Sequence, residues 1–297
     1  MTVSAVVISW NARELTLRCL DSLARATYPQ LDVIVVDNHS HDETAAAVAE
    51  RHPTVEVLLL DTNRGFAGGV NAGLERARAT GADHVFLLNN DATIDPDAIE
   101  PLVAAAADAS VGAVCSQILH EGAETIWYAG ATYDPRRGHQ GRHSGYGKPP
   151  LPKDTPPYPT DRACGGAMLV SRAALDRVGG LDEALFAYAE DVDWSLRARA
   201  VGLELLVAPG SVVRHRVSAS SGGASSPGSV YYALRNGLVV AERAAPLGRL
   251  GTARRRAEAV SAFGVQALLS EAPLRGVRAV LAGFMDAHRR RLGQREL

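Results

Sequence analysis

The sequence predicts an α/β fold in which a mostly parallel central sheet is flanked by helices and followed by a C-terminal helical extension. Two observations carry this prediction. In the N-terminal part, short apolar segments typical of buried strands alternate with segments whose apolar residues have helical spacing, and the connections are short. From Val230 to the end the spacing is helical, with interruptions at Pro246 and Pro273.

The elements of the first half follow one another regularly. The predicted strands are residues 4–9, 32–37, 55–60 and 84–88, and the predicted helices are residues 14–26, 42–52 and 68–81. Each strand ends in polar residues, namely 9–11, 37–40, 61–65 and 89–91. Ligands of such sheets bind at the carboxyl ends of the strands, so these four polar segments are expected to converge on one site.

The second half is less regular. A helix is expected at 97–109, strands at 111–119 and 204–210, a strand leading into a short helix at 164–180, and further ordered segments at 185–202 and 212–223. Residues 134–161 are rich in glycine, proline and basic residues, which predicts a surface excursion or a loop that orders on binding. The serine- and glycine-rich run 218–229 predicts a mobile loop.

Composition and charge limit the function classes. The 297 residues are 46% hydrophobic and carry a net charge of −2, which is typical of a globular protein and gives no general case for nucleic-acid binding. Cys19, Cys115 and Cys164 include no C-x-x-C pair, so neither a disulfide framework nor a zinc site is predicted. The sequence shows no signal peptide and no apolar stretch long enough to span a membrane. We expect a cytoplasmic protein, at most peripheral on the inner face of the cell membrane.

Two polar segments carry candidate ligands for a nucleotide. Asp37 ends a strand and is suited to accept hydrogen bonds from a base or a ribose, although an Asp capping the next helix gives the same pattern. Residues 63–73 hold four glycines at a helix start, where the backbone can approach a phosphate closely. This run does not fit the G-x-G-x-x-G pattern, which counts against a nicotinamide enzyme.

Residues 85–94 join an apolar run to the polar triplet Asn89, Asn90 and Asp91. Asn89 and Asp91 are two residues apart, so they lie on the same side of an extended segment. Amide and carboxylate oxygens there suit a hard divalent cation that keeps water and substrate phosphates among its ligands. Taken alone, an Asx turn at the end of the strand explains the triplet at least as well.

A second acidic cluster contains Glu190, Asp191 and Asp193 next to aromatic residues. Acids packed against apolar side chains usually share a cation, pair with arginine or transfer protons. They also suit the exposed first turn of a helix, and Arg197 and Arg199 are close enough in sequence to neutralise them.

Eight segments in their order connect the chain to a known family: "VVISWNARELTLRCLDSL", "VIVVDNHSHDET", "NRGFAGGVNAGL", "FLLNNDA", "GGAMLVSRAALDRVGGLDE", "FAYAEDVDWSLRARAVG", "VAPGSVVRH" and "YYALRN". From about Val3 to about Val240 the chain resembles family 2 glycosyltransferases of the GT-A fold, in particular the bacterial rhamnosyltransferase-like branch. The resemblance implies an inverting hexosyl transfer from a nucleoside diphosphate sugar to an acceptor hydroxyl.

The resemblance also implies how the chain is organised. Residues 1–110 would form the nucleotide-sugar-binding half of one GT-A domain, residues 111–240 its acceptor-binding and catalytic half, and residues 241–297 a basic helical extension. The donor would be a dTDP- or UDP-sugar, with rhamnose or another deoxyhexose favoured. The acceptor would be either a lipid-linked cell-envelope glycan or a natural product.

Individual residues take roles from the same resemblance. Asp191 matches the catalytic base, and Glu190 is the second choice. Positions that match the nucleotide-sugar site are Ser9, Asn11, Asp37, Asn38, Asn63, Gly65, Gly69, Asn71 and Asn90. Positions that match the acceptor or sugar pocket are Gly165, Gly166, Trp194, Tyr232, Arg235 and Asn236.

The implied cofactor is Mg²⁺ or Mn²⁺, which acts as a Lewis acid on the leaving diphosphate. Asn89 and Asp91 fall on the family's D-x-D metal motif, with asparagine in place of the first aspartate. His215 matches a histidine that supplies a further ligand in some relatives. Because asparagine is a neutral ligand, we expect the metal to bind poorly until nucleotide is present.

The C-terminal segment is strongly basic, since residues 243–297 hold eleven arginines against four acidic residues. A basic helical patch suits an anionic membrane, and hence an acceptor carried on a polyprenyl diphosphate. A solvated helical face or the contact of a homodimer explains the same charge.

Two other functions compete with glycosyl transfer. A nucleotidyltransferase would carry a glycine- and arginine-rich signature near residue 10, which "ISWNARELT" lacks. A non-catalytic sugar-nucleotide-binding protein would not need Asp91, Asp191 and His215.

Overall fold

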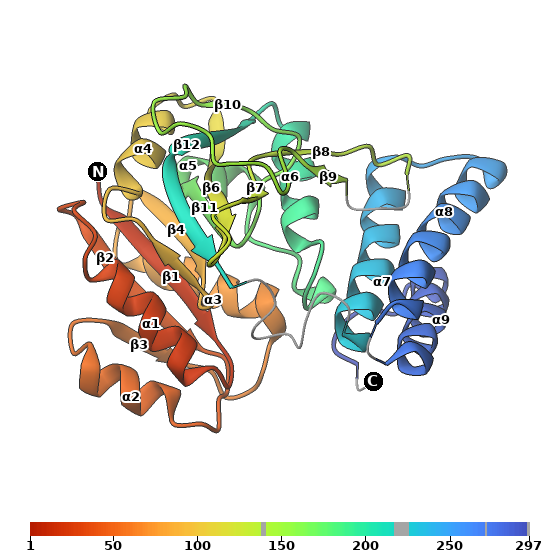
Figure 1. Ribbon diagram of the computed structural model, residues 1–297, viewed down its shortest axis with the longest axis horizontal. Helices are drawn as coiled ribbons and strands as arrows, with labels where there is room; N and C mark the ends of the chain where they lie inside the picture. Colours follow the sequence, from red (N-terminus) through yellow and green to blue (C-terminus); the bar gives the residue numbers. More distant parts are fainter. Residues whose placement is uncertain (138–140, 217–225, 271, 296–297) are drawn as a thin grey trace.

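The structure, a computed structural model, describes residues 1–137, 141–216, 226–270 and 272–295. Figure 1 shows a twisted sheet with helices on both faces and a bundle of three C-terminal helices beside it. The order of the strands across the sheet is β10-β12-β6-β11-β4-β1-β2-β3. The predicted α/β class with a mostly parallel sheet and a C-terminal helical extension is confirmed.

The N-terminal half of the sheet is parallel. β1 (Val3–Ser9) lies between β4 (His84–Asn89) and β2 (Leu31–Asp37), and β3 (Glu56–Leu59) pairs with β2 at the edge. The intervening helices are α1 (Arg13–Leu23), α2 (Thr44–Arg51) and α3 (Gly65–Ala79). Because these strands all run in one direction, their polar carboxyl ends lie at the same edge of the sheet.

The glycine-rich run belongs to helix α3 itself, which begins at Gly65, and is not a turn before the helix as the sequence predicted. A Cβ on Gly73 would lie 2.3 Å from Val6 Cγ1, and a Cβ on Gly69 would lie 3.0 Å from Ile8 Cγ2. These glycines therefore allow α3 to pack closely against β1.

The second half of the sheet contains one strand that opposes the rest. β11 (Ala167–Ser171) inserts antiparallel between β4 and β6 (Val111–His120). β12 (Glu204–His215) runs parallel to β6 and is one strand with an irregularity between Ala208 and Val212, where the sequence predicted two segments. β5 (Ala92–Ile94) pairs with the end of β12, and α4 spans Ile99–Ala105.

The predicted surface excursion is more ordered than its composition indicated. Its strands and those just before it are β7 (Ile126–Tyr128), β8 (Ala131–Thr132), β9 (Arg142–His143) and β10 (Tyr158–Pro159). The Tyr128 hydroxyl, fully buried, donates a hydrogen bond to the Arg162 carbonyl at 2.8 Å. This buried contact lies outside residues 134–161, whose described part contains no buried residue and stays at the surface as predicted.

The remaining elements connect the sheet to the bundle. They are α5 (Arg172–Val178), a short 3-10 helix (Glu183–Leu185), α6 (Glu190–Ala200), α7 (Pro227–Ala244), α8 (Arg249–Leu268) and α9 (Pro273–Arg289). The end of the predicted segment 212–223, and residues 218–225 of the predicted mobile loop, lie outside the described residues. At its end the prediction is wrong, because α7 begins at Pro227 and the Ser226 hydroxyl accepts the Ser229 N–H. No helix in the described ranges is long and apolar enough to cross a membrane.

Candidate active site

Asp91 and His215 form a buried pair at the carboxyl edge of the sheet. The β5–β12 pairing sets His215 opposite Ala92, so its ring lies beside Asp91, with Nε2 at 2.8 Å from Asp91 Oδ1. The other ring nitrogen, Nδ1, is buried without a hydrogen-bond partner among the described residues. Trp127 packs edge-to-face on the same ring, with centroids 5.1 Å apart. The side chains are thus fixed in orientation by their surroundings.

The two asparagines before Asp91 lie in different environments. Asn89 is partly exposed, and its backbone N–H donates to the Gly166 carbonyl at 3.0 Å. Asn90 is buried, and its Nδ2 donates to Thr16 Oγ1 at 3.2 Å. Ser9 Oγ lies 2.7 Å from the same hydroxyl. Ser9 and Asn90 therefore belong to a buried network between β1 and α1, and their implied contact with the nucleotide stays a prediction.

Asp37 and Asn11 shape the turn after β2. Asp37 Oδ1 accepts the Ser40 N–H at 2.7 Å, while Oδ2 has no hydrogen-bond partner within the described chain. Asn11 Oδ1 accepts the His41 N–H at 2.7 Å. Asp37 thus stabilises the turn and keeps one oxygen for a ligand, and it does not cap α2.

Asn38 organises the start of α3. Its Nδ2 donates to Asn63 Oδ1 at 3.1 Å and to the Gly65 carbonyl at 2.9 Å, and its Oδ1 accepts the Arg64 N–H at 2.9 Å. Gly65 has a φ of +71°, a conformation that favours glycine. Asn71 binds both backbone groups of Leu181, and its implied place in the donor loop stays a prediction.

Asp191 lies in the first turn of α6, partly exposed. Its Oδ2 accepts the Gly165 N–H at 3.1 Å, and its Oδ1 accepts the Val192 N–H at 2.7 Å. Glu190, next to it, is buried, and its Oε2 has no partner among the described residues. Burial and the neighbouring Asp191 carboxylate raise the pKa of Glu190 to about 8. At neutral pH Glu190 therefore holds its proton.

Two neighbours in the same helix have partners within the protein. Asp193 is paired with Arg197, with Nε at 2.8 Å from Oδ2. Trp194 is packed in the core, and its indole N–H donates to the Gly179 carbonyl at 2.9 Å. Trp194 therefore contributes to the packing of the core, and its implied place in the acceptor pocket stays a prediction.

Arg235 and Asn236 on α7 are buried and bind backbone carbonyls. Asn236 Nδ2 lies 2.7–2.8 Å from the carbonyls of Leu185, Ala187 and Tyr188. Arg235 donates to the Leu185 carbonyl at 3.0 Å and to another carbonyl near the C-terminus. The pair clamps the segment before α6, and its implied closure over phosphates or acceptor stays a prediction.

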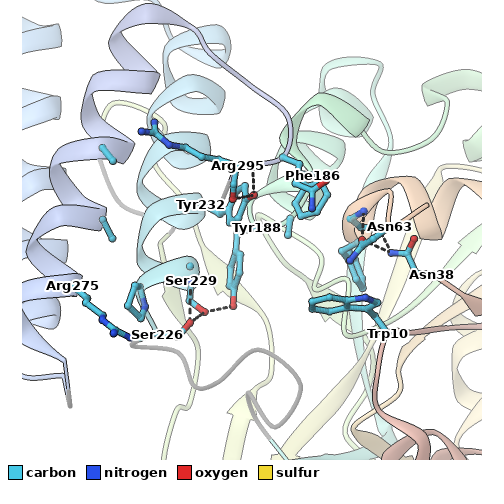
Figure 2. A pocket seen from close by; sticks show the side chains of 18 of the residues that line it. Trp10, Asn38, Asn63, Phe186, Tyr188, Ser226, Ser229, Tyr232, Arg275 and Arg295 are labelled. Carbon is cyan, nitrogen blue, oxygen red and sulfur yellow. Dashed lines mark hydrogen bonds between the residues drawn. The ribbon is translucent and has the colours of Figure 1, made fainter. Parts of the chain in front are cut away.

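A cavity of about 1000 Å³ opens beside the edge of the sheet. Figure 2 shows Trp10, Asn38 and Asn63 on one side of it and Ser226, Ser229 and Arg275 on the other. Among the positions expected in the site, its lining includes Asn38, Asn63, Gly65 and Tyr232. The lining residues that the sequence did not single out include Trp10, Phe186, Tyr188, Arg275 and Arg278. Asp91, Asp191 and His215 lie outside this lining.

Residues 4–179 match the family described as glycosyl transferase family 2, which is more than half of the chain. The protein belongs to this family. It is a glycosyltransferase of the rhamnosyltransferase-like type, which confirms the resemblance noted in the sequence.

One relative of this glycosyltransferase is the N-acetylglucosaminyl-diphospho-decaprenol L-rhamnosyltransferase of Mycobacterium tuberculosis, 30% identical over 225 residues that cover 69% of this chain and 73% of the relative. Two solved structures share the fold. GalNAc-T7 with UDP, GalNAc and Mn²⁺ has a TM-score of 0.61 at 17% identity, over 87% of this chain and 54% of that one. A mannosyltransferase from Pyrobaculum calidifontis with GDP-Man and Mn²⁺ has a TM-score of 0.58 at 21% identity, over 97% of this chain and 75% of that one.

The side chains of this glycosyltransferase include possible ligands for a divalent cation. The described residues contain no group of three or more His, Cys, Asp or Glu side chains that could hold a metal ion. They do contain a carboxylate and an imidazole in contact, Asp91 and His215, with the partly exposed Asn89 two residues before Asp91. Mg²⁺ and similar ions are often bound by one or two protein ligands together with substrate phosphates. The donor set therefore fits a cation that is completed by the substrate.

Proposed function

We propose that this family 2 enzyme is an inverting glycosyltransferase that moves rhamnose, or another deoxyhexose, from a nucleoside diphosphate to an acceptor hydroxyl. The observation that carries the proposal is a pair of hydrogen bonds at two consecutive glycines: the Asn89 N–H donates to the Gly166 carbonyl, and the Gly165 N–H donates to the Asp191 carboxylate. It holds a carboxylate in a fixed position relative to the Asp91–His215 pair. Inverting transfer needs this combination of a base and a site for the leaving diphosphate.

Asp191 is the proposed general base. A base must be ionised and within hydrogen-bond reach of the hydroxyl that it deprotonates. Its neighbour Glu190 holds a proton at neutral pH because of its raised pKa. Two adjacent carboxyl groups in different environments can thus take different roles. Asp191 is also the more exposed of the two, so it can reach an acceptor.

Asp91 and His215 are the proposed protein ligands of Mg²⁺ or Mn²⁺, with Asn89 as a weaker third ligand. When bound, the cation supplies Lewis-acid stabilisation of the negative charge on the leaving diphosphate. The chain itself supplies the orientation, since the edge-to-face contact with Trp127 and the hydrogen bond to Asp91 fix the His215 ring. With few protein ligands, the cation is expected to bind tightly only together with nucleotide.

The donor nucleotide is proposed to bind where β1, β2 and α3 meet the cavity. Asp37 Oδ2 can accept a hydrogen bond from the ribose or the base, and Trp10 offers an aromatic face that is half exposed. The Gly65 turn brings backbone groups to the same edge. A dTDP- or UDP-sugar fits this arrangement, and the rhamnosyltransferase relative favours dTDP-rhamnose.

The proposed acceptor is a lipid-linked cell-envelope glycan. The name of the mycobacterial relative specifies a sugar on a decaprenyl diphosphate, and the basic C-terminal helices suit an anionic carrier. A natural product acceptor remains the alternative, because the donor half would be the same.

The proposal is tested with dTDP-rhamnose, UDP-glucose and GDP-mannose, each with Mn²⁺ and a GlcNAc-diphospho-prenyl acceptor. Release of the nucleoside diphosphate with a product of inverted anomeric configuration, read by proton NMR, is the expected result. Retained configuration, or no turnover of any of these donors, would overturn it.

A further inference from the structure

The cavity has a cationic wall that the donor site does not use. Arg275 and Arg278 lie near the start of α9, and both are exposed. Within the described residues, neither guanidinium has a hydrogen bond or an ion pair. Arg295, the third arginine of the lining, is bound to Asp286. No acidic residue contributes to the described lining, so this wall has an uncompensated positive charge.

The start of α7 adds to this charge from the adjacent wall. α7 has 18 residues, and its first positions, Pro227 to Ser229, line the cavity after the capping residue Ser226. Pro227 has no N–H and the Ser229 N–H is bound by the Ser226 hydroxyl, so the N–H that remains at this helix start is that of Gly228. Among the described residues, a Cβ on Gly228 would meet nothing within 4 Å. Helix N-termini carry partial positive charge and expose N–H groups to anions. Arginine binds phosphate oxygens in pairs, so together these groups select a phosphate or a diphosphate.

The surroundings of the two arginines are apolar. Phe186 and Tyr232 stack in the cavity with ring centroids 5.4 Å apart, and Ala279 and Ala282 line it from α9. Three leucines at the end of α8 and the start of α9 are exposed: Leu268 is 62% exposed, Leu269 83% and Leu274, which directly precedes Arg275 in the chain, 81%. Clustered exposed leucines are unusual on a soluble surface and indicate an apolar partner.

We propose that Arg275 and Arg278 bind the diphosphate of a prenyl-diphosphate-linked acceptor, and that the prenyl chain leaves the protein over the leucines of the α8–α9 turn. The donor then occupies the wall of Asn38 and Asn63, and the acceptor diphosphate occupies the α9 wall opposite. This inference rests on the proposed function, which it deepens by assigning a binding site to the acceptor. An anionic group joined to an apolar chain matches the charge and the apolar surface at the same place.

The test uses farnesyl diphosphate as a soluble probe and measures its binding to the full chain by titration calorimetry, without any turnover. Arg275→Glu combined with Arg278→Glu is expected to weaken binding at least tenfold. The matched control is Arg289→Glu with Arg291→Glu, which makes the same change of charge at the other end of α9, at exposed residues outside the cavity. The control is expected to bind the probe as the wild type does.

Two further titrations test whether the proposed acceptor site is distinct from the donor site, and whether the probe binds through its prenyl chain as well as through its charge. UDP with Mn²⁺ is expected to bind equally well to the wild type and to the Arg275/Arg278 variant. Leu269→Ser combined with Leu274→Ser is expected to weaken the binding of farnesyl diphosphate but not the binding of inorganic pyrophosphate. Unchanged probe affinity in the arginine variant would overturn the inference, as would an equal loss of UDP affinity. The proposed function fails independently, by absence of nucleotide-sugar turnover.

Discussion

Asp191 accepts a hydrogen bond from the backbone N–H of Gly165 at 3.1 Å. The next residue, Gly166, accepts one from the backbone N–H of Asn89 at 3.0 Å. Two consecutive glycines therefore join the acid of α6 to the end of β4, just before Asp91. The Asn89–Gly166 bond uses backbone groups only and survives a change of the Asn89 side chain, whereas the Gly165 bond needs an acceptor oxygen on the side chain of residue 191.

The Asp91–His215 pair predicts a dependence on metal. Asp91→Ala removes the carboxylate ligand and leaves the His215 imidazole without its partner at 2.8 Å. We expect the affinity for UDP in the presence of Mn²⁺ to fall at least about tenfold, since loss of groups around a metal typically costs 10–100-fold. Titration calorimetry with and without Mn²⁺ measures this. Asp97→Ala, at a surface residue paired with Lys153, is the control. Equal UDP affinity in Asp91→Ala and the wild type would remove the metal assignment.

The raised pKa of Glu190 predicts how stability changes with pH. The pKa of Glu190 is about 8 in the folded protein, against the ordinary glutamate pKa of 4.5. Between these values the folded state binds more protons than the unfolded state, so stability falls as pH rises through the window. Glutamine does not titrate, so Glu190→Gln lacks this pH dependence of stability. The melting temperature of the variant minus that of the wild type should therefore increase from pH 5 to pH 8. The exposed substitution Glu50→Gln should run parallel to the wild type. A constant difference for Glu190→Gln would contradict the burial of an acid here.

The clamp on α7 predicts a loss of stability in Asn236→Ala. Its amide donates to three carbonyls in a segment where Phe186, Tyr188 and Ala189 have positive φ angles. Unsatisfied buried carbonyls cost about 1–3 kcal/mol, so urea unfolding should show a loss of that order or more. Arg243→Ala, which removes a surface ion pair on the same helix, should cost about 1 kcal/mol or less. Equal costs for the two variants would refute the clamp.

Two glycines in helices should respond in opposite directions to alanine. In Gly73→Ala, the new Cβ would lie 2.3 Å from Val6 Cγ1, so β1 or α3 must shift. Overpacking of this kind costs about 1–3 kcal/mol. Gly264 in α8 has nothing within 4 Å of an added Cβ, and Gly264→Ala should stabilise the protein by about 0.5–1 kcal/mol through helix propensity. Thermal unfolding of both variants measures the difference, and a stabilising Gly73→Ala would show that the packing of α3 is looser.

The first half of the fold could be predicted because its strands are covered on both faces, and such strands appear in the sequence as apolar runs with polar ends. The antiparallel insertion of β11 could not, because it depends on the pairing of Ala167 with Leu88, far away in sequence. The order of the sheet in the second half is likewise a property of tertiary contacts, which local periodicity does not report.

For the candidate site, too, individual residues could be named from the sequence, but their spatial relations could not. Asp91 and His215 are brought together across 124 residues, and only the family resemblance connected them. Asn236 shows the opposite case: the same sequence pattern suits a ligand contact or a structural clamp, and the decision depends on the carbonyls before α6. Arg275 was counted only as part of a basic tail, because helical sequence alone does not show that α9 lines a cavity.

The role of Asp191 as general base is tested most directly by Asp191→Asn, which keeps the shape of the side chain and its acceptor oxygen for Gly165. General bases typically contribute 10²–10⁴-fold to a rate. We expect kcat for glycosyl transfer to fall by about that factor, while the Kd for the nucleotide sugar stays within about twofold of the wild type. Turnover near the wild-type rate at unchanged donor affinity would contradict the assignment of Asp191 as the base.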